Sequence, residues 1–205
     1  SAVLNVTSRE GNRNNFDAKV NISILSAQAT FEGPIPNGAW LVSGRRTYFD
    51  KVLENTDLNV PPYYFYDLQG HIFTDLSAKD RLSYSFYNGL DDFNYDDIGI
   101  DTYWGNETFS LAYRKIFNDL LVGNFLLASS RFYTYFNLGG ESGLVQDNTI
   151  QDLTGSANLT YFQNEKMTWK FGGHIKELGF NYDNTFADSA LFTIKKAPIE
   201  SAAYT

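Results

Sequence analysis

The chain has 205 residues, about the size of one domain, and 17% of them are aromatic. Aromatic and β-branched side chains suit a pleated sheet with at least one apolar face, so the composition favours an all-β fold. The net charge of −8 is opposite to that of a typical nucleic-acid-binding protein, and the absence of Cys excludes disulfides, thiolate chemistry and Cys-based metal sites.

Residues 1–9 form a short β-type run, which predicts a first strand, and the chain opens with SAVLNVTSRE, without Met, a basic region or a long apolar core. They do not resemble a signal peptide, and we expect the chain to be the interior of a longer protein. From Phe16 to Ile24, apolar and polar residues alternate, which predicts a strand with one apolar face. Further strands are expected over residues 27–32 and 40–50, joined by a turn containing Pro34, Pro36 and Asn37-Gly38.

The same rhythm continues to the end of the chain. Polar loops are expected at residues 54–62, 91–101, 137–148 and 183–188, and tight turns at 77–80, 118–119 and 163–166. Between them, the alternation predicts strands over 63–76, from 82, over 104–117, over 121–136, near 153–161, near 169–175 and from 191. The sequence therefore predicts about ten antiparallel strands in chain order.

Long strands and alternating short and long connections favour a transmembrane β-barrel. Membrane barrels combine short periplasmic turns, longer outer loops and strands of about 9–11 residues. They also escape tests for apolar helices, because lipid-facing and lumen-facing residues alternate. Aromatic residues crowd the predicted strand ends, as in the girdles of outer-membrane barrels. A soluble lipocalin-like barrel or sandwich is the alternative.

Several stretches resemble TonB-dependent receptors of the type with a carboxypeptidase-like regulatory domain upstream. SAVLNVTSREGN resembles the last strand of the plug domain and its exit. ATFEGPIPNGAWLVSGRRTYFD, YYFYDLQGHIFTDLSAKDRLSYSFYNGLDDF and the region from WGNETFSLAYRKIF to SSRFYTYF resemble the first hairpins of the barrel. The resemblance covers nearly the whole chain, but its motifs are structural and include no catalytic or ligand signature.

The resemblance implies that residues 1–12 end a plug domain and that residues 13–205 begin a barrel of about 22 strands. An open arc has unpaired edges that lipid cannot satisfy, so we expect more strands beyond this chain. A small closed barrel of about eight to ten strands is the alternative.

The implied function is active import across the outer membrane. A ferric siderophore, cobalamin or oligosaccharide would bind from outside, and the inner-membrane TonB complex would act on the missing N-terminal part. The expected partners are therefore TonB, outer-membrane lipid and the substrate, with no cofactor, nucleic acid or enzymatic activity. A non-transporting barrel, such as an adhesin, a structural protein or a barrel enzyme, is the alternative.

Four residues are candidates for lining the lumen or contacting the plug. Arg45 and Arg46 point to opposite faces of a strand, so one of them can line the lumen, and the other is expected near a rim. Asp67 and His71 lie on the polar face of the next predicted strand. A catalytic His would need Ser and acidic partners, such as Ser83 and Asp67, but no spacing indicates one. His174 also lies on a polar face, outside any metal-binding spacing.

An acidic cluster marks the predicted loop at residues 91–101. Its density of oxygen ligands could bind Ca²⁺, but the spacing does not match an EF-hand, and a solvated outer loop is the simpler interpretation. The cluster consists of Asp91, Asp92, Asp96, Asp97 and Asp101.

Overall fold

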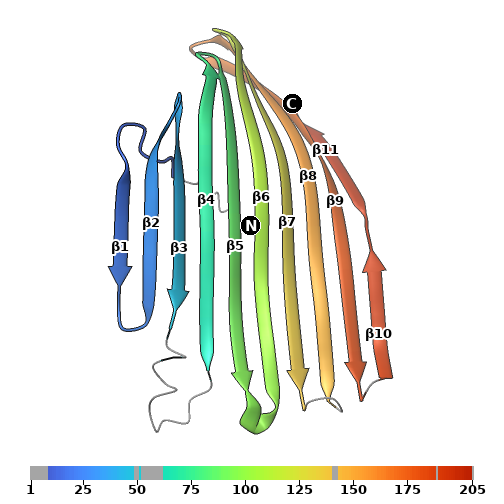
Figure 1. Cartoon of the computed structure of the whole chain (residues 1–205). Helices are drawn as coiled ribbons and strands as arrows, with labels where there is room; N and C mark the ends of the chain where they lie inside the picture. Colours follow the sequence, from blue (N-terminus) through green and yellow to red (C-terminus); the bar gives the residue numbers. More distant parts are fainter. Residues whose placement is uncertain (1–8, 49–50, 52–61, 140–142, 188, 205) are drawn as a thin grey trace.

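The computed structural model describes residues 9–48, 51, 62–139, 143–187 and 189–204. These residues form one open antiparallel sheet in which strands adjacent in the chain pair with each other, except that the last strand pairs with the third strand from the end (Figure 1). The predicted all-β meander is confirmed. The predicted strand in residues 1–9 lies outside the described residues except for Arg9, which is not in a strand.

Short strands lie at both ends of the chain, and the long strands lie between them. The first three are β1 (Asp17–Ile22), β2 (Ser26–Ile35) and β3 (Gly38–Thr47). The long ones are β4 (Tyr63–Ser77), β5 (Asp80–Tyr95), β6 (Ile100–Asn118), β7 (Leu121–Leu138), β8 (Leu144–Asn164) and β9 (Met167–Phe186). The sheet ends with β10 (Ser189–Lys196) and β11 (Ile199–Tyr204).

β10 and β11 are two halves of one interrupted strand. Both pair with β9, and Lys196 opposite Phe180 and Ile199 opposite Glu177 belong to the same register. Pro198 falls in the gap, where it cannot donate a backbone hydrogen bond, although its carbonyl accepts one from Leu178 at 3.0 Å. The prediction of about ten strands therefore agrees with the structure.

The two ends of the sheet differ as predicted. The two-residue connections 36–37, 78–79, 119–120 and 165–166 lie at the upper end in Figure 1. The lower end, which we call the loop end, holds longer connections such as residues 96–99, together with the two-residue connection between β9 and β10. Three predicted loops are shorter than expected, because β5, β6, β8 and β9 continue through polar residues. The connection between β5 and β6 contains only a 3-10 turn, Asp96–Ile98, and Gly99. No helix among the described residues is long and apolar enough to span a membrane.

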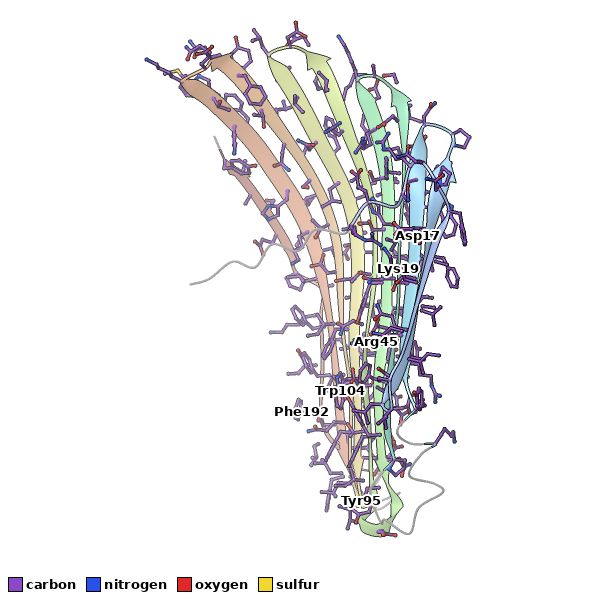
Figure 2. All side chains as sticks on the ribbon, turned by 90° about the vertical axis from the view of Figure 1, so that its left-hand side faces the viewer. Asp17, Lys19, Arg45, Tyr95, Trp104 and Phe192 are labelled. Carbon is purple, nitrogen blue, oxygen red and sulfur yellow. The ribbon has the colours of Figure 1, made fainter. Side chains whose placement is uncertain are left out.

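Alternation gives the sheet two faces. The band face carries apolar side chains such as Val20, Ile72, Leu127 and Ile175, all at least 40% exposed. The strap face is crossed near the tight turns by residues 9–15, which we call the strap. In Figure 2 the upper ends of β6–β9 bend toward the side on which the strap lies.

The apolar residues of the band face form a slanting band. The row of paired residues through Val20 crosses β4 at Leu68, β6 at Glu107 and β9 at Gly179. The apolar run of β9, from Met167 to Ile175, is centred about eight residues from Gly179, toward the tight turn. The band thus shifts by about one residue per strand. It comprises residues 16–22, 27–35, 38–44, 68–76, 82–90, 109–117, 121–129, 153–161 and 167–175.

Candidate functional site

The strap is held on the sheet by three ion pairs that span four strands. Arg9 donates to Glu32 of β2 at 3.0 Å, and Arg13 donates to Asp75 of β4 at 2.9 Å. Glu10 accepts from Arg81 of β5 at 2.7 Å. These partners are separated by 23 to 71 positions in the sequence, so no local pattern could reveal them.

The most enclosed part of the strap face lies beneath the strap. Phe73 is 1% exposed and has the guanidinium groups of Arg13 and Arg81 over its ring, at 4.5 and 4.7 Å from the centroid. Glu32 is 3% exposed and also lies 3.7 Å from Lys19. A buried carboxylate needs such partners, so the strap and β1 together satisfy Glu32.

Beside the strap, the strap face forms a polar hollow of about 740 Å³. His71 lies in its wall, and its Nδ1 is 2.8 Å from Ser85 Oγ. Arg9 and Glu10 of the strap also line the hollow. Hydroxyl and amide side chains from β2 to β6 lie between apolar ones in the rest of its wall: Gln28, Thr30, Ser43, Gln69, Ser83, Thr108 and Ser110. The wall of the hollow therefore supplies both hydrogen-bond donors and acceptors.

Arg45 and Asp67 face each other on the strap face. The Arg45 Nη2 and Nε atoms lie 2.6 and 2.8 Å from Asp67 Oδ2, and the guanidinium lies over Phe65. Arg46 points to the band face near the loop end, where it lies 4.9 Å from the centre of the Tyr64 ring. The structure thus places the two arginines on opposite faces, as the alternation predicts.

The possible Ser–His–Asp arrangement does not form. Asp67 is engaged by Arg45, and the hydroxyl bonded to His71 belongs to Ser85 rather than Ser83. His174 lies on the strap face of β9, where its Nε2 atom is 3.7 Å from Glu200 of β11.

The acidic cluster is distributed over two strands and both faces of the sheet. Asp91 and Asp92 belong to β5, and Asp101 belongs to β6; Asp96 and Asp97 belong to the 3-10 turn. Within the part of the chain that the structure describes, no three acidic or His side chains are placed to hold a metal ion. The predicted loop from 91 to 101 is therefore largely sheet.

Two of these carboxylates bind tyrosines near the loop end. The Tyr63 hydroxyl donates to Asp91 at 2.6 Å on the strap face, and the Tyr64 hydroxyl donates to Asp92 at 3.3 Å on the band face. Burial, together with the hydrogen bond to Asp91, raises the pKa of Tyr63 to about 12. Burial also raises the pKa of Asp92. These pairs fasten β4 to β5 beyond the apolar band.

The two faces exchange character toward the loop end. Beyond the apolar band, the band face carries Asp92, Asp101, Glu107, Arg131, Asp147, Asn181 and Asp183 among tyrosines. On the strap face, the polar residues near the tight turns give way to a wall rich in aromatic side chains: Tyr63, Phe65, Phe93, Trp104, Phe132, Phe136, Phe180, Tyr182 and Phe192. Two of these, Trp104 and Phe192, are labelled in Figure 2.

This aromatic wall is accessible and carries few charges. Trp104 is 37% exposed and Phe192 is 52% exposed. Phe180 and Tyr182 stack with ring centroids 6.3 Å apart. Aromatic surfaces combined with a few fixed polar groups are typical of small-molecule sites, so this wall is the candidate ligand-facing surface. The predicted strands did not include this exchange of faces, although the alternation of residues beyond the apolar runs contains its signal.

Comparisons with known proteins identify no relative: no family model, no curated protein and no solved structure matches the chain. The assignment of function therefore depends on the residues and their geometry.

Proposed function

We propose that the chain forms part of the wall of a TonB-dependent outer-membrane importer, with the band face toward lipid and the strap face toward the lumen. The observation that carries the proposal is the slanting apolar band, opposite a polar face crossed by the strap. In a water-soluble protein, such a large exposed apolar surface would require a cover.

The slope of the band matches the geometry of a membrane barrel. With a rise of about 3.3 Å per residue and about 4.8 Å between strands, a shift of one residue per strand corresponds to a tilt of about 35°. Membrane barrels have strand tilts of about 35–45°. A nine-residue run at this tilt spans about 22 Å, close to the apolar band of about 25 Å in outer-membrane barrels.

The exchange of faces supports a wall that extends beyond the membrane. Once a strand leaves lipid, its outward face needs to be polar, and its inward face is free to be aromatic. β9 continues from Ile175 to Phe186 beyond the band, which corresponds to a height of about 30 Å. The aromatic strap face of this part would surround the entrance and contact a substrate with flat apolar surfaces.

The strap supports a connection between the wall and an upstream plug. It lies on the lumen side near the tight turns, which are the periplasmic end of such barrels. The polar hollow beside it would face the plug. Residues 1–12 would thus end the plug, and residues 13–205 would begin a barrel completed by further strands.

The test is uptake by cells that express the full-length gene. Growth on candidate scarce nutrients, including ferric siderophores, cobalamin and oligosaccharides, should require the gene for one of them, and accumulation of that nutrient should stop when TonB is deleted. Uptake that persists without TonB would contradict the proposal. A surface phenotype such as adhesion, without any uptake, would favour a non-transporting barrel.

A paired substitution tests the aromatic wall. Trp104→Ala should raise the substrate concentration for half-maximal uptake about tenfold, because a stacking ring contributes about 1 kcal/mol or more. Tyr103→Ala changes the adjacent residue on the opposite face and should change the substrate concentration for half-maximal uptake by no more than about twofold. Equal effects of the two substitutions would argue against a ligand-facing role for this wall.

A further inference from the structure

The aromatic wall of the strap face contains a regular patch on β6–β9. Three successive rows of paired residues cross these four strands, and the middle row consists of Trp104, Thr134, Asn148 and Tyr182. One neighbouring row leads from Thr102 to Asn184, and the other leads from Asn106 to Phe180. All three rows lie beyond the apolar band, and we call the side chains of these rows the neutral patch.

The neutral patch contains no charged residue. Its aromatic side chains are Trp104, Phe132, Phe136, Phe180 and Tyr182. Its amide and hydroxyl side chains are Thr102, Asn106, Thr134, Gln146, Asn148 and Asn184, and Ile150 completes it. The two kinds alternate on neighbouring strands: Trp104 is flanked by polar residues on β6, whereas Thr134 is flanked by phenylalanines on β7. Ring faces and hydrogen-bonding groups are therefore interspersed.

The charged residues that continue these rows onto other strands are engaged or turned away. Arg45 binds Asp67 at 2.6 Å, and Asp91 accepts a hydrogen bond from Tyr63 at 2.6 Å. Lys196 pairs with Phe180 in the register, but its side chain lines a hollow that includes band-face residues. The neutral patch thus offers dipoles and ring faces rather than net charge.

A ligand in the lumen can reach the neutral patch. Trp104 and Phe132 are both 37% exposed. The amide oxygen of Asn148 has no hydrogen-bond partner among the described residues. A ligand hydroxyl that turns this amide toward the surface would supply the missing partner, and the amide nitrogen can donate at the same time.

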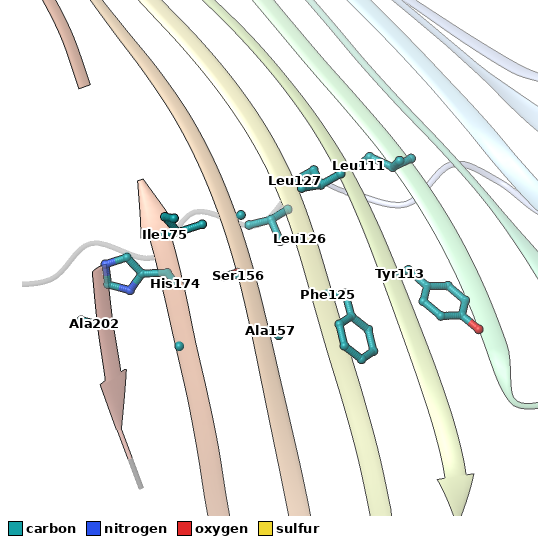
Figure 3. Close-up of a pocket in the computed structure, with 12 residues that line it drawn as sticks. Leu111, Tyr113, Phe125, Leu126, Leu127, Ser156, Ala157, His174, Ile175 and Ala202 are labelled. Carbon is teal, nitrogen blue, oxygen red and sulfur yellow. The ribbon is translucent and has the colours of Figure 1, made fainter. Parts of the chain in front are cut away.

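An apolar groove of about 650 Å³ crosses β7, β8 and β9 on the opposite face. Figure 3 shows Phe125 and Leu127 on one side of Ala157 and Ile175 on the other. Under the proposed orientation this groove faces lipid, so it is closed to a water-soluble substrate. The neutral patch is open to the lumen.

We propose that the neutral patch binds an uncharged oligosaccharide, which names the substrate class of the importer and rests on the function proposed above. A pyranose ring presents C–H groups on its flat faces and hydroxyl groups around its edge, so it matches a surface of alternating rings and amides. Trp104 and Tyr182 stack on sugar rings, and Asn148 bonds to a hydroxyl group between them.

The dimensions of the neutral patch favour more than one sugar. The middle row spans three intervals of about 4.8 Å, or about 14 Å, which exceeds the width of a single ring. An anionic ferric siderophore would need cations to bind its carboxylate or catecholate oxygens, and the neutral patch carries none.

Binding of the purified full-length protein to a glycan array, in a detergent without a sugar headgroup, tests this assignment. The array carries neutral and acidic glycans, and the strongest binding should be to neutral glycans of at least two sugars. The affinity for the best glycan is then measured by calorimetry. Trp104→Ala/Tyr182→Ala should lower it at least about tenfold, and Asn148→Ala should lower it at least about threefold.

Asn181→Ala is the matched control, because it removes an amide with an unpartnered oxygen from the band face of β9 and should leave the affinity unchanged. Each variant is checked for a folded barrel by its heat-dependent mobility on gels. Unchanged affinity in the double variant, or an equal loss in Asn181→Ala and Asn148→Ala, would overturn the site. Binding to no neutral glycan, or a preference for acidic glycans, would overturn the substrate class.

The two proposals fail in different ways. TonB-dependent uptake of a ferric siderophore or cobalamin, without glycan binding, would support the importer and overturn the oligosaccharide assignment. Glycan binding that depends on Trp104 and Tyr182, without TonB-dependent uptake, would support the site and contradict the importer.

Discussion

Glu32 illustrates how single residues connect the strap to the sheet. Its carboxylate is buried, and its cationic partners come from the strap and from β1. Asp75 has a similar role with Arg13 and Arg81. Charge-assisted hydrogen bonds contribute more than neutral ones, about 1.5–3 kcal/mol each, and their loss leaves buried charge without compensation.

We predict that Glu32→Gln/Asp75→Asn loosens the strap. Trypsin cleavage after Arg9 and Arg13 in the folded protein should accelerate about tenfold or more, because local opening costs less without these two ion pairs. The control is Glu107→Gln, which weakens the loose pair with Arg131 on the opposite face. Equal cleavage rates in the two variants would mean that ionic contacts do not hold the strap.

A second prediction at this scale concerns lipid exposure. Leu127 lies within the apolar run of β7 and is 60% exposed. Leu127→Arg should lower the free energy of unfolding by about 2–4 kcal/mol, whereas Thr149→Arg, beyond the band on β8, should change it by about 1 kcal/mol or less. Urea unfolding in lipid vesicles measures both values. Similar losses at the two positions would contradict the proposed membrane boundary.

Among the elements, β3 shows what sequence reasoning captured and what it missed. The Asn37-Gly38 turn was predicted from its residue types, and Asn37 has a positive φ of 56°. The close approach of β4 to Gly38 was not predictable, because it depends on the register between strands. A Cβ atom at Gly38 would collide with the carbonyl oxygen of Phe73.

We therefore predict different outcomes for two glycines of one strand. Gly38→Ala should destabilise the folded protein by at least about 1–3 kcal/mol, because the backbone of β4 would have to shift. Gly44→Ala should be tolerated within about 0.5 kcal/mol, since its new methyl group would contact Leu68 at an ordinary 3.5 Å. Urea midpoints of the two variants provide the comparison. A Gly38→Ala variant with an unchanged urea midpoint would show that β3 and β4 do not pack closely at Gly38.

The ends of the long strands were predicted less well than their centres. Stretches rich in Asp, Asn and Gly, such as those at 91–101 and 137–148, are typical of loops. In this sheet many of these residues continue the strands, because the backbone ladder extends beyond the apolar band and the tyrosines Tyr63 and Tyr64 bind Asp91 and Asp92. Local composition indicates where a strand leaves an apolar environment, but not where its hydrogen bonding stops.

For the whole molecule, the proposed orientation predicts which positions are reachable from outside the cell. The chain has no Cys, so single cysteines can serve as reporters wherever the rest of the protein also lacks them. In intact cells, a membrane-impermeant maleimide should label Asn181→Cys, beyond the band on β9. It should not label Phe171→Cys within the band. Labelling at both positions, or at neither, would contradict the orientation.

The strap also sets a minimum circumference for the proposed barrel. At a tilt of about 35°, each strand occupies about 6 Å of the perimeter, so a ring of about ten strands would measure about 19 Å between opposite backbones. Packed polypeptide layers lie about 10 Å apart, so in such a ring the strap on one wall would touch the opposite wall and leave no passage. A barrel that carries the strap and still admits a substrate must therefore have a longer circumference than these strands alone supply.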